Sequence, residues 1–187
     1  IGNDAFAGCR SLEGIELPNS ITQIASYAFG GCSSLKSITI PNSVSAISNN
    51  SFENCTSLES VSIPNSVTKI GESAFYTCKS LKNIVIPNSV SHIGDYTFQN
   101  CASLESITLP QSITDIAYRL FENCSSLKSI TIPDNVTTIY EHAFQNCTSL
   151  ENVIIPNSVT TIYDDAFNNC TSLKNINLPN SVTTICK

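Results

Sequence analysis

Apolar and polar residues alternate over short stretches of this chain, and the segment 35–40 is typical. Leu35, Ile38 and Ile40 are apolar there, whereas the residues on either side of Ile38 are polar. A period of two predicts a β-strand with one buried face. Pro41 follows, and because proline lacks the N–H that a strand ladder needs, we expect the strand to end at that residue.

A second apolar pair, Val44 and Ile47, comes after the turn residues that follow Pro41. This spacing predicts that the chain turns back inward and forms a second short strand. The segment around Ala28 and Phe29, which precedes the first strand, is expected to form one helical or 3₁₀ turn.

The whole pattern recurs every 23 residues, and four residue types mark the period. Prolines stand at Pro18, Pro41, Pro64, Pro87, Pro110, Pro133, Pro156 and Pro179. Phenylalanines stand at Phe6, Phe29, Phe52, Phe75, Phe98, Phe121, Phe144 and Phe167, and columns of cysteine and leucine follow the same interval. A unit of this size cannot bury its own apolar face, whereas stacked copies bury a continuous one.

The repeat therefore predicts a solenoid, a right-handed superhelix of eight 23-residue turns. We expect a parallel β-sheet on one face, with strands about 4.8 Å apart, and short strands and 3₁₀ or single helical turns elsewhere. Residues 1–187 form one array without a domain boundary. The array begins and ends within a repeat, so we expect an excerpt of a longer protein, and its uncapped ends predict an end-to-end homodimer.

The outward positions of the predicted sheet form two columns that we take as the candidate ligand-binding face. They hold Ser37, Ser60, Asn83, Ser106, Ser129 and Asn152 in one column, and Thr39, Ser62, Val85, Thr108, Thr131 and Ile154 in the other. Solenoids commonly bind partners along such a sheet, which favours a groove for a protein or a glycan. The alternative is a solvated β-face, and the absence of Trp, Tyr and Arg from these columns supports it.

Eight of the nine cysteines, from Cys9 to Cys170, fall one per turn. Parallel side chains about 4.8 Å apart suit neither the geometry of a disulfide nor a metal site, so we predict buried free thiols. Cys186 lies outside this column. Either it belongs to a repeat that is cut off, which we favour, or it links two chains.

Two further sets of positions have an obvious chemistry. Acidic and basic residues alternate strictly at Glu13, Lys36, Glu59, Lys82, Glu105, Lys128, Glu151 and Lys174, which predicts favourable stacking of neighbouring turns. Tyrosines and acidic residues gather in the variable positions before each Phe, and they form either a partner-binding edge or ordinary loop variation.

Six N-x-S/T sequons occur, at Asn49, Asn54, Asn123, Asn135, Asn146 and Asn169. They would accept glycans only in a eukaryotic secretory pathway.

Composition excludes several functions. Charged residues make up 13% of the chain and the net charge is −6, so nucleic acid and anionic membrane surfaces are not expected partners. No apolar run is long enough for membrane insertion. The two histidines, His92 and His142, fall in different columns of the repeat, and no catalytic, cofactor or metal-binding motif occurs. We therefore predict no enzyme, no cofactor and no metal site.

The repeat resembles leucine-rich repeats, whose core is L-x-x-L-x-L-x-x-N-x-L. Leu35, Ile38 and Ile40 fit the first half of this pattern. In the second half, Ser43 stands at the position of the Asn, and the apolar residue Val44 comes one position earlier than the last Leu of the pattern. That variant, with its A-F-x-x-C signature, resembles the BspA-like or Treponema-type leucine-rich repeats of bacterial and protozoal surface proteins. The resemblance implies a cell-surface or extracellular protein that adheres to host or matrix proteins or glycans. The alternative is a structural spacer that displays another domain.

Overall fold

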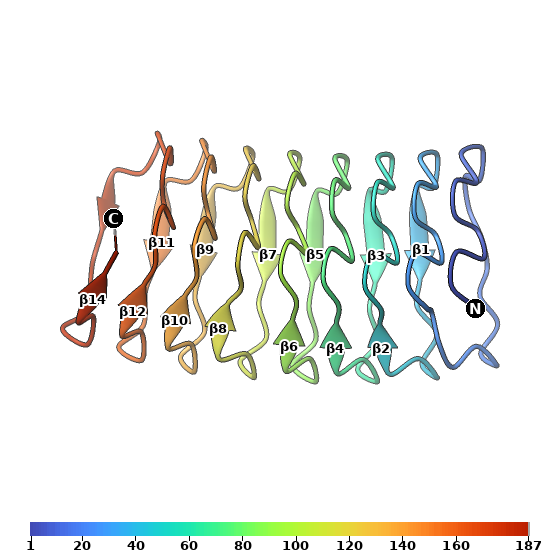
Figure 1. The fold of residues 1–187 in the computed structure, drawn as a ribbon, viewed down its shortest axis with the longest axis horizontal. Coiled ribbons are helices and arrows are strands. Elements are labelled where there is room, and N and C mark those ends of the chain that lie inside the picture. Colours follow the sequence, from blue (N-terminus) through green and yellow to red (C-terminus); the bar gives the residue numbers. More distant parts are fainter. Residues whose placement is uncertain (187) are drawn as a thin grey trace.

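In the computed structural model, which describes residues 1–186, successive coils of the chain lie side by side in one row. The N-terminus lies at one end of the row and the C-terminus at the other (Figure 1). From the second coil on, each coil carries one strand of each of two sets. The first set, whose members precede the repeat proline, is β1 (Ser37–Thr39), β3 (Ser60–Ser62), β5 (Asn83–Val85), β7 (Ser106–Thr108), β9 (Ser129–Thr131), β11 (Asn152–Ile154) and β13 (Asn175–Ile176).

The second set consists of two-residue strands at the Val-Thr-x-Ile stretch of each repeat. It comprises β2 (Ala46–Ile47), β4 (Lys69–Ile70), β6 (His92–Ile93), β8 (Asp115–Ile116), β10 (Thr138–Ile139), β12 (Thr161–Ile162) and β14 (Thr184–Ile185). The predicted second strand is thus confirmed.

The strands pair in parallel with a register of one repeat. Ser37 pairs with Ser60 in the first set, and Thr138 pairs with Thr161 in the second. Ladders join two to four strands at a time, and β3 with β5 and β7 with β9 lie in contact between the ladders of the first set. The parallel β-solenoid with a 23-residue repeat is confirmed. The count of eight turns and the handedness stay predictions.

The expected helical or 3₁₀ turn is wrong: within residues 1–186 the chain forms no helix. Two residues of each coil, four positions apart, have a left-handed backbone, as at Tyr27 (φ 57°) and Gly31 (φ 72°). A helix needs successive residues with negative φ, so it cannot propagate through these positions. The N–H groups instead alternate in direction. That of Ala28 bonds within the coil to Ala25, and that of Phe29 bonds to Ser51 of the next coil.

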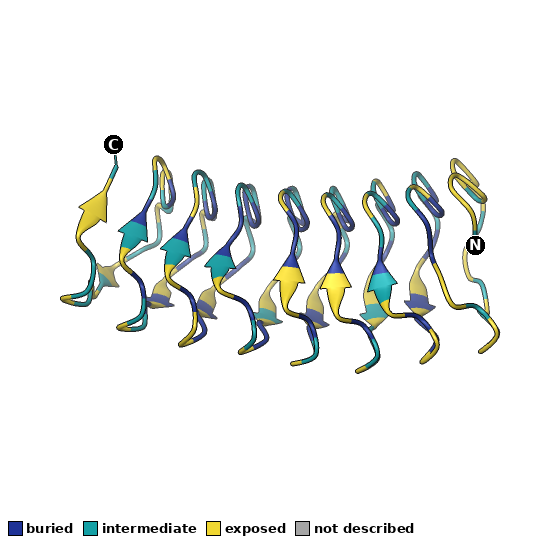
Figure 2. Ribbon diagram, turned by 60° about the horizontal axis from the view of Figure 1, so that its bottom comes forward, coloured by how far each residue is buried: buried dark blue, intermediate teal, exposed yellow. Residues whose placement is uncertain are grey.

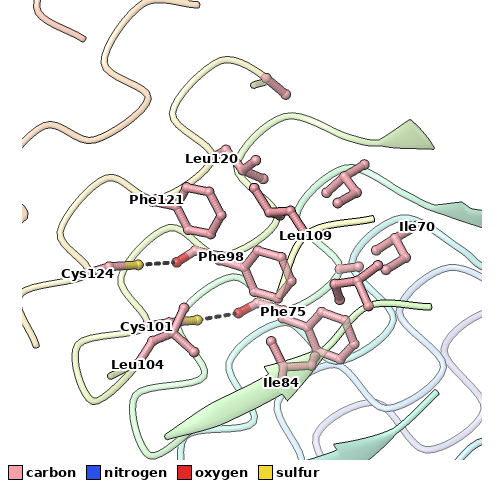
Figure 3. Close-up of a cluster of buried hydrophobic side chains, with 14 of the residues drawn as sticks. Ile70, Phe75, Ile84, Phe98, Cys101, Leu104, Leu109, Leu120, Phe121 and Cys124 are labelled. Atoms are coloured by element: carbon pink, nitrogen blue, oxygen red, sulfur yellow. Dashed lines mark hydrogen bonds between the residues drawn. The ribbon is translucent and has the colours of Figure 1, made fainter. Parts of the chain in front are cut away.

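The core is one continuous apolar cluster built from several repeat positions, and its phenylalanines form a column along the array. Phenylalanine rings from Phe6 to Phe167 stack with centroids 5.2–5.8 Å apart and planes within 15° of parallel. The six interior rings, Phe29 to Phe144, are fully buried. Figure 3 shows how Phe75, Phe98 and Phe121 pack with Leu104 and Leu120 around them.

The cysteine column lies against this stack. In every interior coil the Sγ donates to the carbonyl oxygen of the phenylalanine in the preceding coil, as from Cys124 to Phe98 at 3.2 Å. No disulfide forms among the described residues, and the thiols from Cys32 to Cys147 are buried, as predicted. The exceptions lie near the ends: Cys9 is exposed, and Cys170 and Cys186 are half-buried, because fewer coils cover them. Figure 2 shows the same gradient, with exposed strand β14 beside the buried interior coils.

At the repeat position where the leucine-rich-repeat pattern has asparagine, serine hydroxyls bond to the preceding coil. The hydroxyl of Ser66 donates to the carbonyl oxygen of Val44 at 2.8 Å, and that of Ser89 donates to Val67 at 2.7 Å. Asn135, the one asparagine in this column, reaches two residues further back and donates to the carbonyl oxygen of Gln111 at 2.8 Å. Each hydroxyl thereby satisfies a turn carbonyl of the preceding coil.

Candidate functional site

The strands of the first set position the candidate ligand-binding face. In β1 the side chain of Ile38 is buried, whereas Ser37 and Thr39 on either side of it are exposed. The parallel register then aligns like positions of successive strands, so that Asn83 pairs with Ser106 and Val85 pairs with Thr108. All twelve predicted face residues are exposed, and the register brings them together into two outward columns. Whether they bind a ligand stays a prediction.

The chemistry of this face is mostly hydroxyl and amide. Ser106 donates to the Oδ1 of Asn83 at 2.6 Å, so neighbouring side chains of one column can bond to each other. Two apolar residues interrupt the second column, and both are well exposed: Val85 at 67% and Ile154 at 62%. Exposed aliphatic side chains among small polar ones give such a surface contact points that a fully polar surface would lack.

Two open depressions indent the side of the solenoid that carries the first strand set. One, near the N-terminus, involves Ser37, Thr39 and Pro41. The other has a volume of about 610 Å³ and is lined in part by Ser62, Val85 and Thr108. The face is therefore not flat, although nothing encloses a small molecule there.

The alternating charges border this face and form ion pairs. Lys36 lies 2.7 Å from Glu13, and Lys174 lies 3.1 Å from Glu151. Each lysine pairs with the glutamate of the preceding coil, so the pairs divide the array into units of two coils. Both side chains of such a pair are well exposed and screened by solvent, so the alternation bears on the stacking of neighbouring coils. The hydrogen bond and charge of Lys36 lower the pKa of Glu13.

Metal-ligating residues do not converge. Nowhere in residues 1–186 do three or more His, Cys, Asp or Glu side chains come together in a group that could hold a metal ion. The buried thiols are also poor ligands in their neutral form, because desolvation raises their pKa, to about 12 for Cys55 and for Cys101.

The two histidines have separate surroundings. His92 is exposed on β6, whereas the ring of His142 lies 5.9 Å from the ring of Tyr118 and 3.9 Å from a carboxylate oxygen of Asp165. Neither arrangement pairs a histidine with a nucleophile.

Sequence reasoning underestimated the turn edge, which we define as the segments 2–8, 25–31, 48–54, 71–77, 94–100, 117–123, 140–146 and 163–169. All six tyrosines of the chain lie on it. The Tyr96 and Tyr118 rings meet edge to face at 5.2 Å, and the Tyr140 and Tyr163 rings stack at 5.5 Å. The sequence showed that tyrosines gather before each Phe, but not which of them touch, because they stand at different positions of the repeat.

An asparagine ladder on the turn edge was also missed. Asn146 donates to the Oδ1 of Asn123 at 2.8 Å, and Asn169 donates to the Oδ1 of Asn146 at 2.9 Å. These residues have left-handed backbones, which asparagine tolerates better than most residues. Asparagine recurs at this repeat position in the sequence, but its members there were interpreted only as sequons.

No helix in the described part of the chain combines the length and the hydrophobicity that a bilayer crossing would need.

The stacked parallel strands, the 23-residue register and the Leu-x-x-Ile-x-Ile strand segment define the class of leucine-rich-repeat proteins. Within that class, the sequence pattern described as the BspA-type leucine-rich-repeat region matches residues 1–128 and 91–187, with six copies of the repeat. The chain therefore belongs to the BspA-type leucine-rich-repeat family.

Solved structures agree. A leucine-rich-repeat protein from Bacteroides ovatus is 40% identical with a TM-score of 0.95; the match covers 100% of this chain and 48% of that protein. The leucine-rich-repeat protein of T. pallidum is 36% identical with a TM-score of 0.78, over 81% of this chain and 71% of that one. A leucine-rich cell surface protein from Faecalibacterium prausnitzii is 29% identical with a TM-score of 0.51, over 93% and 68%.

This chain thus spans about half the length of the Bacteroides ovatus protein. No curated protein gives a significant sequence match. The matched family is one of repeat scaffolds, which are typically non-catalytic, and these comparisons indicate no enzyme family.

Proposed function

We propose that this chain is a non-catalytic binding module of a cell-surface or secreted protein, and that it mediates adhesion to a host or matrix protein or glycan. Membership of the BspA-type family supports a repeat scaffold. The similarity to a protein described as a leucine-rich cell surface protein supports the location.

The observation that carries the proposal is the exposure of two side-chain columns in register along the first strand set. Hydroxyl and amide groups at intervals of about 4.8 Å can bond to an extended protein segment or a glycan chain. Val85 and Ile154 add apolar contacts three coils apart. The face carries little charge, which agrees with a partner that is neither nucleic acid nor an anionic membrane.

The proposed array has eight right-handed coils, more than the six copies matched by the family pattern. The uninterrupted ring stack from Phe6 to Phe167 supports this number. Eight coils would give the binding face a length of roughly 35–40 Å.

The test compares two outward substitutions of equal charge. Thr131→Glu lies on the proposed face, and Ser91→Glu lies at the exposed residue immediately before β6, outside that face. Binding is measured by surface plasmon resonance against immobilised extracellular-matrix proteins and a glycan array. We expect T131E to weaken every interaction of the parent chain and S91E to leave it unchanged. A parent chain that binds nothing in these assays would instead support the spacer.

The proposal also includes end-to-end association of the isolated chain. Leu178 and Ile185 of the last coil are exposed, at 45% and 61%, and strand β14 has no neighbour beyond it within the described residues. Unpaired strand edges of this kind are templates for pairing. Sedimentation equilibrium should show a fraction of dimer that increases with protein concentration. A monomer at every concentration would contradict end-to-end association.

A further inference from the structure

An open depression on the turn edge combines acidic and aromatic side chains. Its volume is about 410 Å³, and Glu53, Glu72, Ser73, Tyr76, Tyr96 and Gln99 line it. These residues come from three consecutive coils. All six occupy positions where the repeats differ from one another, so the lining does not follow from the repeat pattern.

Ser73, which lines the depression, is the smallest residue at its position of the repeat. The same repeat position holds Tyr96 in the next coil and Arg119 two coils further on. Ser73 and Arg119 have the same left-handed backbone, each with a φ of 53°. The two residues therefore differ in side chain and not in φ, and Ser73 lines the depression together with Tyr76 and Tyr96.

The surroundings favour a cation. The turn edge carries eight acidic residues and one basic residue, Arg119. Glu53 and Glu72 form no ion pair with any residue in the described range 1–186. The carboxylate of Glu53 is held in place by the amides of Asn50 and Asn54, at 2.8 and 3.0 Å. Two carboxylates, one of them held in place, beside two aromatic rings are a combination that suits an organic cation.

The chain itself shows how a guanidinium uses this edge. The guanidinium carbon of Arg119 lies 5.1 Å from the centre of the Tyr118 ring, and its Nη1 lies 3.1 Å from the Glu122 carboxylate. Glu122 in turn accepts a hydrogen bond from Gln99 at 2.6 Å. A ring and a carboxylate thus hold a cation at the repeat position that Ser73 leaves open two coils earlier.

We propose that the depression at Ser73 binds an arginine side chain presented by a basic segment of the protein partner. The proposal rests on the proposed binding function but uses a different surface from the sheet face. The guanidinium would lie against Tyr76 or Tyr96 and bond to Glu72, as Arg119 does with Tyr118 and Glu122. The pocket is open, so the partner inserts one side chain and the remaining acidic edge attracts its other basic residues.

The experiment titrates the folded chain with the peptide acetyl-Gly-Arg-Gly-amide and follows the ring resonances of Tyr76 and Tyr96 by NMR. The matched peptide contains citrulline, which keeps the shape of arginine and removes its charge. We expect saturable shifts with the arginine peptide and at least fivefold weaker binding of the citrulline peptide. Glu72→Gln should lower the affinity for the arginine peptide about two- to fivefold, since the loss of one exposed contact to a cation has an effect of that size.

Ser73→Arg supplies the decisive variant. Because Arg119 occupies the equivalent backbone conformation, we expect S73R to fold, to place its own guanidinium in the depression and to abolish the saturable shifts. If S73R fails to fold, E72Q decides the outcome. T131E on the sheet face should leave the peptide affinity unchanged, which separates this site from the adhesive face. Equal binding of the two peptides, or unchanged affinity in both E72Q and S73R, would overturn the proposal.

Discussion

The Sγ of Cys101 donates a hydrogen bond to the carbonyl oxygen of Phe75, 3.3 Å away in the preceding coil (Figure 3). The same oxygen accepts the backbone N–H of Cys78 at 3.1 Å. The phenylalanine carbonyls from Phe6 to Phe144 thus use both of their acceptor positions, one within the coil and one toward the next. The relationship explains why a small residue with a weak donor recurs at this position, without any need for disulfide or metal chemistry.

Burial of the thiols predicts which of them react. In the native chain, Ellman's reagent should modify Cys9 rapidly, since it is exposed, and Cys186 more slowly. The thiols from Cys32 to Cys147 should react only after unfolding, when all nine become available. Rapid native modification of Cys78 or Cys101 would show that the column is not part of the core.

The same thiols predict a loss of stability at alkaline pH. A thiol of the unfolded chain ionises near the ordinary pKa of 9.0, whereas burial raises the pKa of Cys55 to about 12 in the folded chain. Unfolding therefore releases a proton above pH 9, so this contribution to stability is complete below pH 9 and is lost as the pH rises toward 12. Urea denaturation at pH 8 and pH 10.5 should show the loss. Cys55→Ala should lose less free energy of unfolding between these two pH values than the parent chain. An equal loss in the variant and the parent chain would contradict this cause.

The phenylalanine stack predicts the cost of truncation. Phe75 is fully buried between Phe52 and Phe98, at centroid distances of 5.5 and 5.7 Å. Phe75→Ala should lower the free energy of unfolding by about 3–5 kcal/mol. Phe6→Ala, at a half-buried ring of the first coil, is the matched control and should cost less. Calorimetry that gives under about 1 kcal/mol for F75A would exclude this ring from the core.

The asparagine ladder predicts a difference between two substitutions of Asn146. Its side chain both donates and accepts within the ladder, and its φ is 59°. Asn146→Gly keeps the backbone but loses the side-chain bonds, so we expect a cost of about 1 kcal/mol. Asn146→Ala loses the bonds and also strains the backbone, which adds about 1 kcal/mol. Thermal melts that rank alanine above glycine would contradict the left-handed assignment.

How much the sequence predicted depends on whether a residue repeats. Phe75, Cys78 and Ile84 recur at fixed intervals, so their common burial followed from the period alone. The outward columns and the Glu13–Lys36 pairing followed in the same way, because one coil predicts the next. The left-handed position before each phenylalanine did not follow, since Tyr27, Ser73 and Arg119 share no turn-forming chemistry. Stacking on the neighbouring coils imposes that conformation on whichever residue stands there.

For the candidate site, the sequence predicted only which side chains are exposed. Alternation along β5 placed Asn83 and Val85 outward, and the structure agrees. The depression at Ser73 is lined by the smallest residue of its repeat position and by Tyr76 and Tyr96, which stand at different positions of the repeat. Such juxtapositions arise from the stacking of unlike coils, which a single repeat pattern does not describe.

The central claim is that each 23-residue coil advances the array by one strand spacing. Spin labels at Ser37→Cys and Asn152→Cys, five coils apart on the exposed face, test it directly in a chain whose exposed Cys9 and half-buried Cys170 and Cys186 are replaced by serine. Double electron–electron resonance should give one narrow distance of about 24 Å, five strand spacings of about 4.8 Å. A broad distribution, or a distance beyond about 40 Å where five stacked coils cannot reach, would contradict the solenoid.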